Sequence, residues 1–459
     1  MEKPASILSA LVLLAAAAIF FMPAPAGTNA NIMHAGALLV LVIGLWAVGS
    51  LPEYLTGLIF FLLAMVLAIA PASVVFSGFA SGTVWLVLGG LVIAEAVSRT
   101  GLGARFARFM LGRLALSYPA LIVAVVIVSG ALCFVMPATV ARILLLLPII
   151  SALAERLGLA RGGTGHNGVC LAMMMTNYHV GTTILPANAP NMVLAGSVET
   201  LYNTTLIYAE FLMVQFPVMA IAKSLLTFVL VLWLFPAHTT MAAERHADPQ
   251  PLSAEEQRLT LILFSALALW ATDFLHHINP GWVALGAGIA CLLPRIGVIA
   301  TNRRGEGLKL DIVIYLAAVI GLGAVVVQTG LNQVGAQIVL QTLDLKAGQD
   351  AFNFMQLSLL ATGMGLVVTN VAQPALLAPL AEGFAQAVGW PLKSVLMTMA
   401  VGFSTMILPY QVPPMLVGMH VAGLRLRTML RLCLPLAAVS LLVLLPLDYL
   451  WWRVIGYFG

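Results

Sequence analysis

The residue with the most distinctive chemistry in this sequence is an arginine inside a long apolar run. Arg142 follows the segment 136–139 and precedes Ile143–Leu147. If this run lies in a bilayer, a charge at its centre costs about 2.5–3.5 kcal/mol on insertion scales, and such residues usually face a cavity. A cation near the beginning of a helix also opposes the helix dipole. An anionic ligand would relieve both costs; the alternative is that Arg142 snorkels to the cytoplasmic interface.

Proline beside polar residues interrupts the apolar sequence at four places. Two are expected hairpin tips, at 136–139 and 369–371, and two are expected helix breaks, at 186–191 and 409–414. Non-helical backbone inside a membrane is tolerated only where it lines a cavity or is buried in protein. Helix N-termini at the tips would suit an anion, and unwound carbonyls at the breaks would suit a coupling cation. Simple proline kinks in packed helices are the alternative.

These segments predict one binding site. The expected substrate-binding residues are Ala138, Thr139, Arg142, Asn188, Thr369, Asn370, Gln373 and Pro413. The candidates for coupling to a cation are Thr139, Asn188, Asn370, Gln411, Glu95 and His179. Glu95 could carry a proton or pair with Arg142, and His179 could titrate near neutrality, although a hydrogen-bonded structural histidine fits equally well. Lys223 is expected to snorkel. No cofactor or resident metal is expected, and Na⁺ or H⁺ is left open as the coupling ion.

The composition restricts the class of protein. Of 459 residues, 61% are hydrophobic and 8% are charged, whereas an ordinary soluble domain has roughly 25% charged residues. Only a lipid bilayer can solvate such a chain. The basic residues are scattered, which excludes a nucleic-acid partner, and the four cysteines lack metal-ligand spacing. We find no His-Glu-x-x-His and no serine–histidine set, so we do not expect an enzyme.

Apolar stretches of about twenty residues predict an all-α membrane protein with about eleven transmembrane helices. Two further stretches, at about 118–152 and 354–387, are expected to be re-entrant hairpins, and the fifth and tenth helices are expected to be broken. The other spans are expected near 5–22, 32–50, 54–71, 83–99, 257–275, 280–298, 311–330 and 429–452.

The distribution of basic residues predicts the orientation in the membrane. With two hairpins that enter and leave on one side, 16 of the 21 basic residues fall on the side of the N-terminus. Basic loops mark the cytoplasmic side. The sequence therefore predicts a multi-pass inner-membrane protein with a cytoplasmic N-terminus, whose first apolar run is retained as a helix rather than removed as a signal peptide.

Three pairs of motifs recur in the same order and indicate an internal repeat. Val84–Leu102 resembles Val313–Leu331, and both end in Thr-Gly-Leu. ARILLLLP (141–148) matches AQPALLAP (372–379), and ILPANAPNM (184–192) matches ILPYQVPPM (407–415). The separations are 229, 231 and 223 residues.

This repeat divides the chain into residues 1–236, a cytoplasmic linker at 237–256, and residues 257–459. The fourth and ninth helices are separated by an odd number of crossings, so the repeats are expected to be inverted. Inverted repeats with broken helices are typical of secondary transporters, which bind solute at the repeat interface. An ancient duplication without a transport role is the alternative.

In these motifs the chain resembles the divalent anion:sodium symporter family of the ion transporter superfamily. The resemblance implies a homodimer that carries a small dicarboxylate, citrate or sulfate anion, usually with sodium, by an elevator-type movement. The family's Ser-Asn-Thr tip motif corresponds to Ala138-Thr139-Val140 and Thr369-Asn370-Val371, where only Asn370 is identical. The position of Arg142 is normally small and uncharged. We therefore hypothesise that Arg142 supplies charge that sodium otherwise brings. The closest rival functions are a cation–proton antiporter of the same superfamily and an uncoupled anion exchanger.

Overall fold

The computed structural model describes residues 2–25, 27–114, 117–239, 251–299 and 310–459. Regular structure in these ranges is helical, without strands, so the all-α class is confirmed. Among the described residues, five helices are long and apolar enough to cross a membrane, and several shorter apolar helices accompany them. The five are Gly82–Thr100, Tyr118–Val135, Tyr208–Leu234, Leu310–Gln328 and Leu426–Val454.

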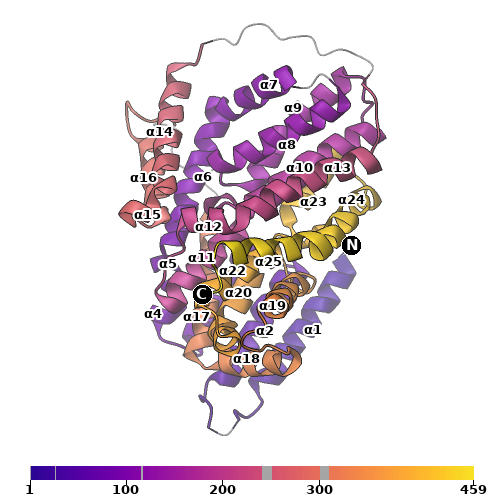
Figure 1. Cartoon of the computed structure of the whole chain (residues 1–459). Helices are drawn as coiled ribbons and strands as arrows, with labels where there is room; N and C mark the ends of the chain where they lie inside the picture. The colour runs from indigo at the N-terminus through magenta and orange to yellow at the C-terminus, as the bar shows by residue number, and fades with distance from the viewer. Residues whose placement is uncertain (1, 26, 115–116, 240–250, 300–309) are drawn as a thin grey trace.

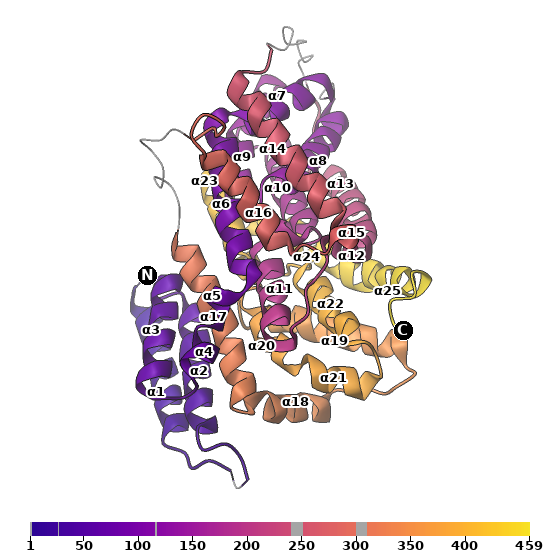
Figure 2. The ribbon, with the colours of Figure 1, turned by 90° about the vertical axis from the view of Figure 1, so that its left-hand side faces the viewer.

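The first three apolar runs form a group of helices at one edge of the molecule, as Figures 1 and 2 show. They are α1 (Glu2–Phe20), α2 (Ile32–Val48) and α3 (Glu53–Val66). Helix α2 packs against both α1 and α3. Helix α3 ends before residue 71, the expected end of the third span, because the chain turns at Ala68, whose φ is 48°.

The Thr-Gly-Leu motif forms the same turn in both halves of the chain. Helices α6 (Gly82–Thr100) and α17 (Leu310–Gln328) each have 19 residues. The glycine that follows each helix has left-handed backbone, with φ of 72° at Gly101 and 77° at Gly330. Glycine adopts this conformation without steric cost, which makes it a common helix stop. A second, shorter helix follows each turn: α7 (Leu102–Leu114) and α18 (Leu331–Thr342).

The first expected hairpin is present. Helix α8 (Tyr118–Val135) is followed by three extended residues, and α9 (Thr139–Arg156) returns alongside it. The Ser117 hydroxyl caps α8 by accepting the N–H of Ala120 at 3.4 Å. The tip therefore places the N-terminus of α9, three residues before Arg142, inside the protein.

The second hairpin is also present, but its returning limb is divided. Helix α19 (Asp350–Met364) leads to the tip, and α20 (Gln373–Leu377) and α21 (Ala381–Val388) return. The 3-10 turn Ala378–Leu380 separates the two returning helices. Pro379 in this turn has no N–H and cannot extend the α-helical hydrogen-bond ladder. The matching Pro148 is accommodated inside α9.

The two expected helix breaks are confirmed. In the first, α10 (Thr164–Gly181) and α11 (Ala189–Tyr202) are separated by non-α-helical backbone with a 3-10 turn at Leu185–Ala187. In the second, α22 (Leu392–Phe403) and α23 (Pro413–Ala422) flank a 3-10 turn at Pro409–Gln411.

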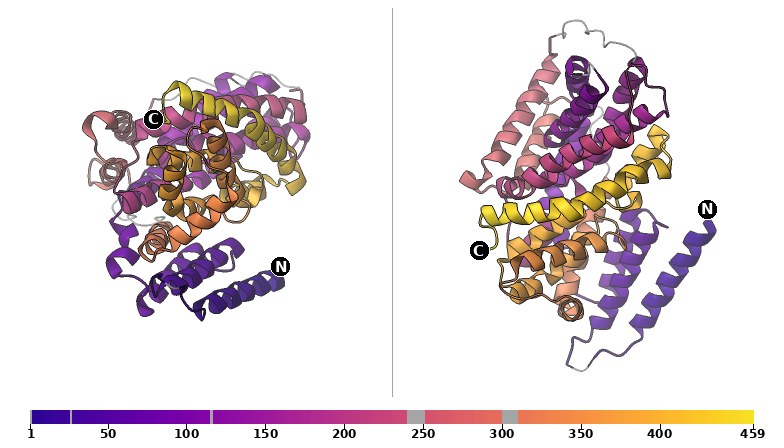
Figure 3. Two further views of the ribbon diagram at one scale, coloured as in Figure 1. Left: turned by 60° about the horizontal axis from the view of Figure 1, so that its bottom comes forward. Right: turned by 45° about the vertical axis from the view of Figure 1, so that its right-hand side comes forward.

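Each half ends with a long helix that contains a π-helical segment. Helices α12 (Tyr208–Phe216) and α13 (Lys223–Leu234) flank one segment, and α24 (Leu426–Val439) and α25 (Leu445–Val454) flank the other. Figures 1 and 3 show α13 beside α24, which it contacts. The order of elements from α6 to α13 thus repeats from α17 to α25.

Helices α14 (Ala254–Ala271), α15 (Asp273–His276) and α16 (Pro280–Leu292) connect the repeats. Helix α16 packs tightly on α6. A methyl group added to Gly89 would lie 2.3 Å from the carbonyl oxygen of Ala284, so only glycine allows this approach of the two backbones. Residues 240–250 of the expected linker, and the basic loop at 300–309, lie outside the described residues.

Candidate functional site

The first tip and the first break meet around the side chain of Arg142, which is completely buried. Its Nε donates a hydrogen bond to Oδ1 of Asn177 at 3.0 Å. One terminal nitrogen donates to the carbonyl oxygens of Ala187, at 3.0 Å, and Met136. The other donates to Oγ1 of Thr139 at 3.1 Å and to the carbonyl oxygen of Asn177 at 3.5 Å. The guanidinium is therefore enclosed in a cage of neutral oxygen atoms.

This cage solvates the guanidinium but leaves its charge uncompensated. No acidic side chain in the described parts of the chain forms an ion pair with Arg142. A buried charge without a counter-charge is costly. Arg142 does not snorkel; it is turned toward the first break. An uncompensated positive charge at this position favours an anion nearby.

Asn188, in the first break, belongs to the same half of the site as Arg142. It is 4% exposed, and its Oδ1 lies 3.3 Å from the hydroxyl oxygen of Thr139. Within the described ranges its Nδ2 has no hydrogen-bond partner. Gly181, at the end of α10, keeps space for the guanidinium, because a methyl group there would lie 2.9 Å from a terminal nitrogen of Arg142.

The second tip and the second break meet in a corresponding way. The backbone N–H of Asn370 donates to the carbonyl oxygen of Gln411 at 2.9 Å. The side-chain Nδ2 of Asn370 donates to the carbonyl oxygen of Phe403, also at 2.9 Å, and to the hydroxyl of Tyr178. Oε1 of Gln411 accepts the N–H groups of Ile407 and Leu408, both at 2.7 Å. These bonds hold the tip against the break.

Helix α10 joins the two halves of the site. Asn177 and Tyr178 are neighbours in the sequence; Asn177 accepts from Arg142, and Tyr178 accepts from Asn370. The hydroxyl of Tyr178 also donates to the carbonyl oxygen of Phe403 at 2.5 Å. The two tips and two breaks therefore form one continuous polar region.

Several buried amides in this region have atoms for which the described part of the chain provides no hydrogen-bond partner. Such atoms are uncommon in native proteins and need an explanation, and a polar ligand supplies one. Both kinds of group are available: N–H groups that can donate to an anion, and oxygens that can accept from a proton donor or bind a cation. The amide atoms without a partner are Nδ2 of Asn177 and Asn188, Nε2 of Gln373 and Gln411, Oδ1 of Asn191 and Asn370, and Oε1 of Gln373.

Four other predicted residues lie at the tips and the second break. Ala138 precedes α9, and Pro413 begins α23; both are half-buried. The carbonyl oxygen of Thr369 accepts the N–H of Gln373 at 3.2 Å. The Gln373 side chain itself is completely buried.

Two cation-coupling candidates lie apart from this polar region. Glu95 forms an ion pair with Arg99 on its own helix, and its side chain is 28% exposed. Of the two roles considered for Glu95, pairing with Arg142 is therefore not what the structure shows, and carrying a proton stays a prediction. His179 is buried, and its Nε2 lies 3.0 Å from the hydroxyl oxygen of Ser224. Its Nδ1 has no partner among the residues that the structure describes. The contact with Ser224 places the ring at the interface of α10 and α13.

The expectation that Lys223 snorkels is also wrong. Its side chain is 2% exposed, and its Nζ donates to the carbonyl oxygen of Ser404 at 2.9 Å and to Oγ1 of Thr405 at 3.0 Å. Ser404 and Thr405 follow α22 at the second break, about 180 positions away in the sequence. Only the fold brings these groups to the lysine.

Sequence reasoning missed three residues of the site, namely Asn177, Tyr178 and Asn191. The Nδ2 of Asn191 donates to the carbonyl oxygens of Gly181, at 3.1 Å, and Ile184, at 2.9 Å, and so holds the first break open. The available signal was the polar run Asn177-Tyr178-His179 inside an apolar helix, of which only the histidine was selected.

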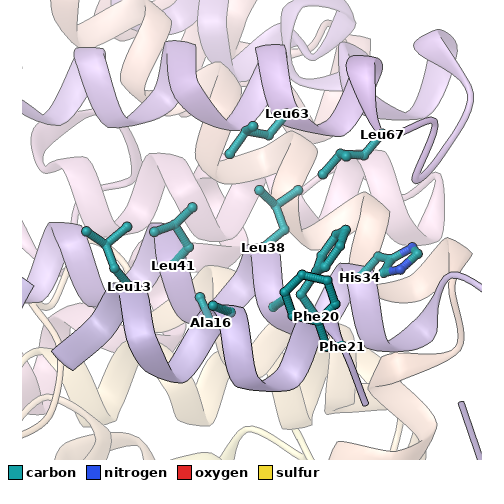
Figure 4. A pocket seen from close by; sticks show the side chains of 11 residues that line it. Leu13, Ala16, Phe20, Phe21, His34, Leu38, Leu41, Leu63 and Leu67 are labelled. Carbon is teal, nitrogen blue, oxygen red and sulfur yellow. The ribbon is translucent and has the colours of Figure 1, made fainter. Parts of the chain in front are cut away.

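A groove between α1, α2 and α3 is lined almost entirely by apolar side chains, with His34 as the exception (Figure 4). It has a volume of about 250 Å³. The ring of His34 stacks on Phe20, with 4.4 Å between ring centroids. Among the described residues that line this groove, His34 alone has a polar side chain, so the groove offers few donors to a small anion, and we place the candidate site at the tips and breaks instead.

The fold and the polar region together define a membrane transporter of the repeated, broken-helix class. The chain matches the family described as the sodium:sulfate symporter transmembrane region over residues 4–458. This match covers nearly the whole chain, so the protein belongs to that family.

Individual relatives agree with this assignment. An uncharacterized transporter of Haemophilus influenzae is 24% identical over 442 residues, which are 91% of each chain. A putative malate transporter of Bacillus subtilis is 25% identical over 296 residues, 60% of each chain. The crystal structure of the Alcanivorax borkumensis YdaH transporter matches with a TM-score of 0.55 at 16% identity, over 93% of this chain and 99% of that one. The last similarity concerns the fold alone.

Proposed function

We propose that this protein is a secondary active transporter of a small divalent anion, namely a dicarboxylate, a related organic anion or sulfate. The family name and the putative malate transporter among its relatives support this substrate class. We further propose elevator-type alternating access in a homodimer of the inner membrane, with a cytoplasmic N-terminus. The repeated hairpins and broken helices support such a mechanism.

The observation that carries the proposal is the caged guanidinium of Arg142. It is buried, it makes five hydrogen bonds to neutral oxygens, and it has no acidic partner in the described residues. Because its N–H groups are already used, Arg142 attracts the solute by charge rather than by direct bonds. The unpaired amide N–H groups of Asn188, Gln373 and Gln411 are left to contact the anion.

The cage of oxygen atoms around Arg142 is also relevant to the identity of the coupling ion. Backbone carbonyl, amide and hydroxyl oxygens at an unwound helix are the ligands that a coupling sodium ion uses in transporters. Here oxygen atoms of these kinds bind the guanidinium of Arg142 instead. We therefore propose that Arg142 replaces a coupling cation at the first break, and that transport depends only weakly on sodium.

Reconstitution into proteoliposomes tests this proposal. Uptake and counterflow of succinate, malate, sulfate and a sulfonate are measured with and without a sodium gradient. We expect dianion transport with little change on adding sodium, and its loss in Arg142→Ala. Arg108→Ala, a surface arginine on α7, serves as the matched control. Robust sodium-driven transport by Arg142→Ala would contradict the proposal.

His179 favours a second candidate function, a cation–proton antiporter, because it is buried with one ring nitrogen unpaired. An antiporter would show pH-dependent sodium flux without any added anion. An uncoupled exchanger would instead show counterflow of the anion but no accumulation against a gradient. The same proteoliposomes distinguish all three.

A further inference from the structure

A buried lysine and a buried aspartate lie near each other where the last helices of the two repeats meet. Lys223 is 2% exposed and Asp448 is completely buried. Lys223 belongs to the span Tyr208–Leu234, and Asp448 belongs to the span Leu426–Val454. Ionisable residues inside a membrane are rare, and they mark functional sites by default, particularly proton relays.

The two residues lie at similar, although not identical, places in the two repeats. They are 225 positions apart, within the 223 to 231 that separate the matched motifs. Lys223 directly follows the π-helical segment Pro217–Ala222, and Asp448 follows the segment Ser440–Leu444 by four residues. The two segments contact each other. Helix α25, which contains Asp448, also contacts the segment Pro217–Ala222 that precedes Lys223, so both residues lie where the two halves of the chain join.

Their hydrogen bonding differs sharply. The ammonium of Lys223 donates to Ser404 and Thr405 at the second break. Neither carboxylate oxygen of Asp448 has a hydrogen-bond partner among the described residues. No ion pair joins the two groups among the described residues, but each affects the electrostatic environment of the other. A buried ionised carboxylate without hydrogen bonds is unstable, whereas a protonated one is much less so.

The other ionisable groups nearby are committed elsewhere. On α10, His179 faces Lys223 and contacts Ser224. On α12, Glu210 accepts from Lys393 at 3.1 Å and from Tyr457 at 2.8 Å. On α19, which also packs on α25, Asp350 accepts from Trp390 at 2.8 Å. Arg453 and Tyr449 share the helix of Asp448, and neither bonds to it.

We propose that Asp448 carries the proton that couples solute movement to the proton gradient, with Lys223 as its positioning partner. A proton from the aqueous phase adds to a carboxylate oxygen of Asp448, and the charge of the pair changes from zero to +1. This inference rests on the proposed anion transport and replaces sodium by a proton as the coupling ion.

The charges of the buried groups are consistent with this exchange. Arg142 contributes +1 in all conditions. The protonated Lys223–Asp448 pair contributes a further +1, so a bound dianion is neutralised in the loaded protein. Loss of the proton leaves +1 in total, which no longer balances a dianion. Protonation therefore favours the loaded state, and deprotonation favours release.

Proteoliposomes with a trapped pH indicator test the proposal, with succinate as the probe. We expect inward succinate movement to acidify the lumen in the wild type. In Asp448→Asn we expect at least a tenfold smaller proton signal, while succinate counterflow is retained. Asp448→Glu should restore the proton signal with a shifted pH profile. Asp344→Asn, at an exposed aspartate paired with Lys346, is the matched control and should behave as wild type.

A second measurement does not depend on transport. Infrared difference spectra of the purified protein should show a carboxylic acid band on acidification that Asp448→Asn lacks and Asp448→Glu shifts. Absence of that band, or proton movement by Asp448→Asn equal to wild type, would overturn the assignment of Asp448. If the wild type moves none of the probe anions but the band is present, the proposed function fails while the proton site stands.

Discussion

Replacing Arg142 by methionine removes a buried positive charge and keeps most of the side-chain length. The carbonyl oxygens of Met136 and Ala187 then lose their donor, and an unsatisfied buried acceptor costs about 1–3 kcal/mol. This part of the effect concerns folding and the shape of the first break. It acts equally on every ligand, so it does not by itself reveal the role of the charge.

The electrostatic part depends on the ligand's charge. For a unit anion roughly 8 Å from the guanidinium, with an effective dielectric constant of about 20, the attraction is about 2 kcal/mol. This corresponds to roughly a 30-fold change in affinity, and for a dianion to about 4 kcal/mol, or roughly a thousandfold. We therefore expect Arg142→Met to weaken succinate binding far more than binding of a monoanion such as lactate.

Isothermal titration of the purified protein with succinate, lactate and an uncharged diamide measures this gradation. Arg142→Lys retains the charge and should recover most of the dianion affinity. Equal losses for the dianion and the monoanion would refute the electrostatic argument, because a purely structural defect does not depend on ligand charge. Thermal unfolding of the same variants separates the folding cost.

Three further substitutions probe the surroundings of the site. Tyr178→Phe removes the hydroxyl between the two halves and should lower stability by about 1–3 kcal/mol, seen as a reduced melting temperature; an unchanged melting temperature would show that this bridge contributes little. Gly181→Ala pushes a methyl group against the guanidinium and should weaken dianion binding roughly tenfold, about 1.4 kcal/mol, whereas Gly286→Ala, where a methyl group meets nothing within 4 Å, should not. Glu95→Gln should leave uptake and its pH profile unchanged, since this carboxylate is paired with Arg99; a flattened pH profile would show that Glu95 takes part in coupling.

The positions of the tips and breaks could be predicted because they are local features. Proline next to polar residues in apolar sequence has few structural outcomes, and the structure places both hairpins and both breaks where these residues indicate. The repeat helped, since each feature was seen twice. The interruption of the second hairpin's returning limb was not expected, although Pro379 is its cause.

The contacts within the site could not be predicted in the same way. Tyr178 bonds to Asn370, and Lys223 to Ser404, across about 180 to 190 positions of sequence. A lone lysine in an apolar helix has the same local sequence whether it snorkels or turns inward. Glu95 shows a different kind of failure. Its sequence suggested a role at the site, whereas Arg99, four residues along the same helix, forms an ion pair with its carboxylate.

The seam between α6 and α16 has a mechanical consequence. Where Gly89 meets Ala284 the two backbones are in close contact, with no side chain of Gly89 between them. Because the packing of α6 on α16 is this close, we expect the two helices to move together as one rigid unit. Whatever displacement carries the solute has to take place at another boundary. A cross-link that joins α6 to α16 should consequently leave transport intact. Distances from these two helices to the others then report which helices move during transport.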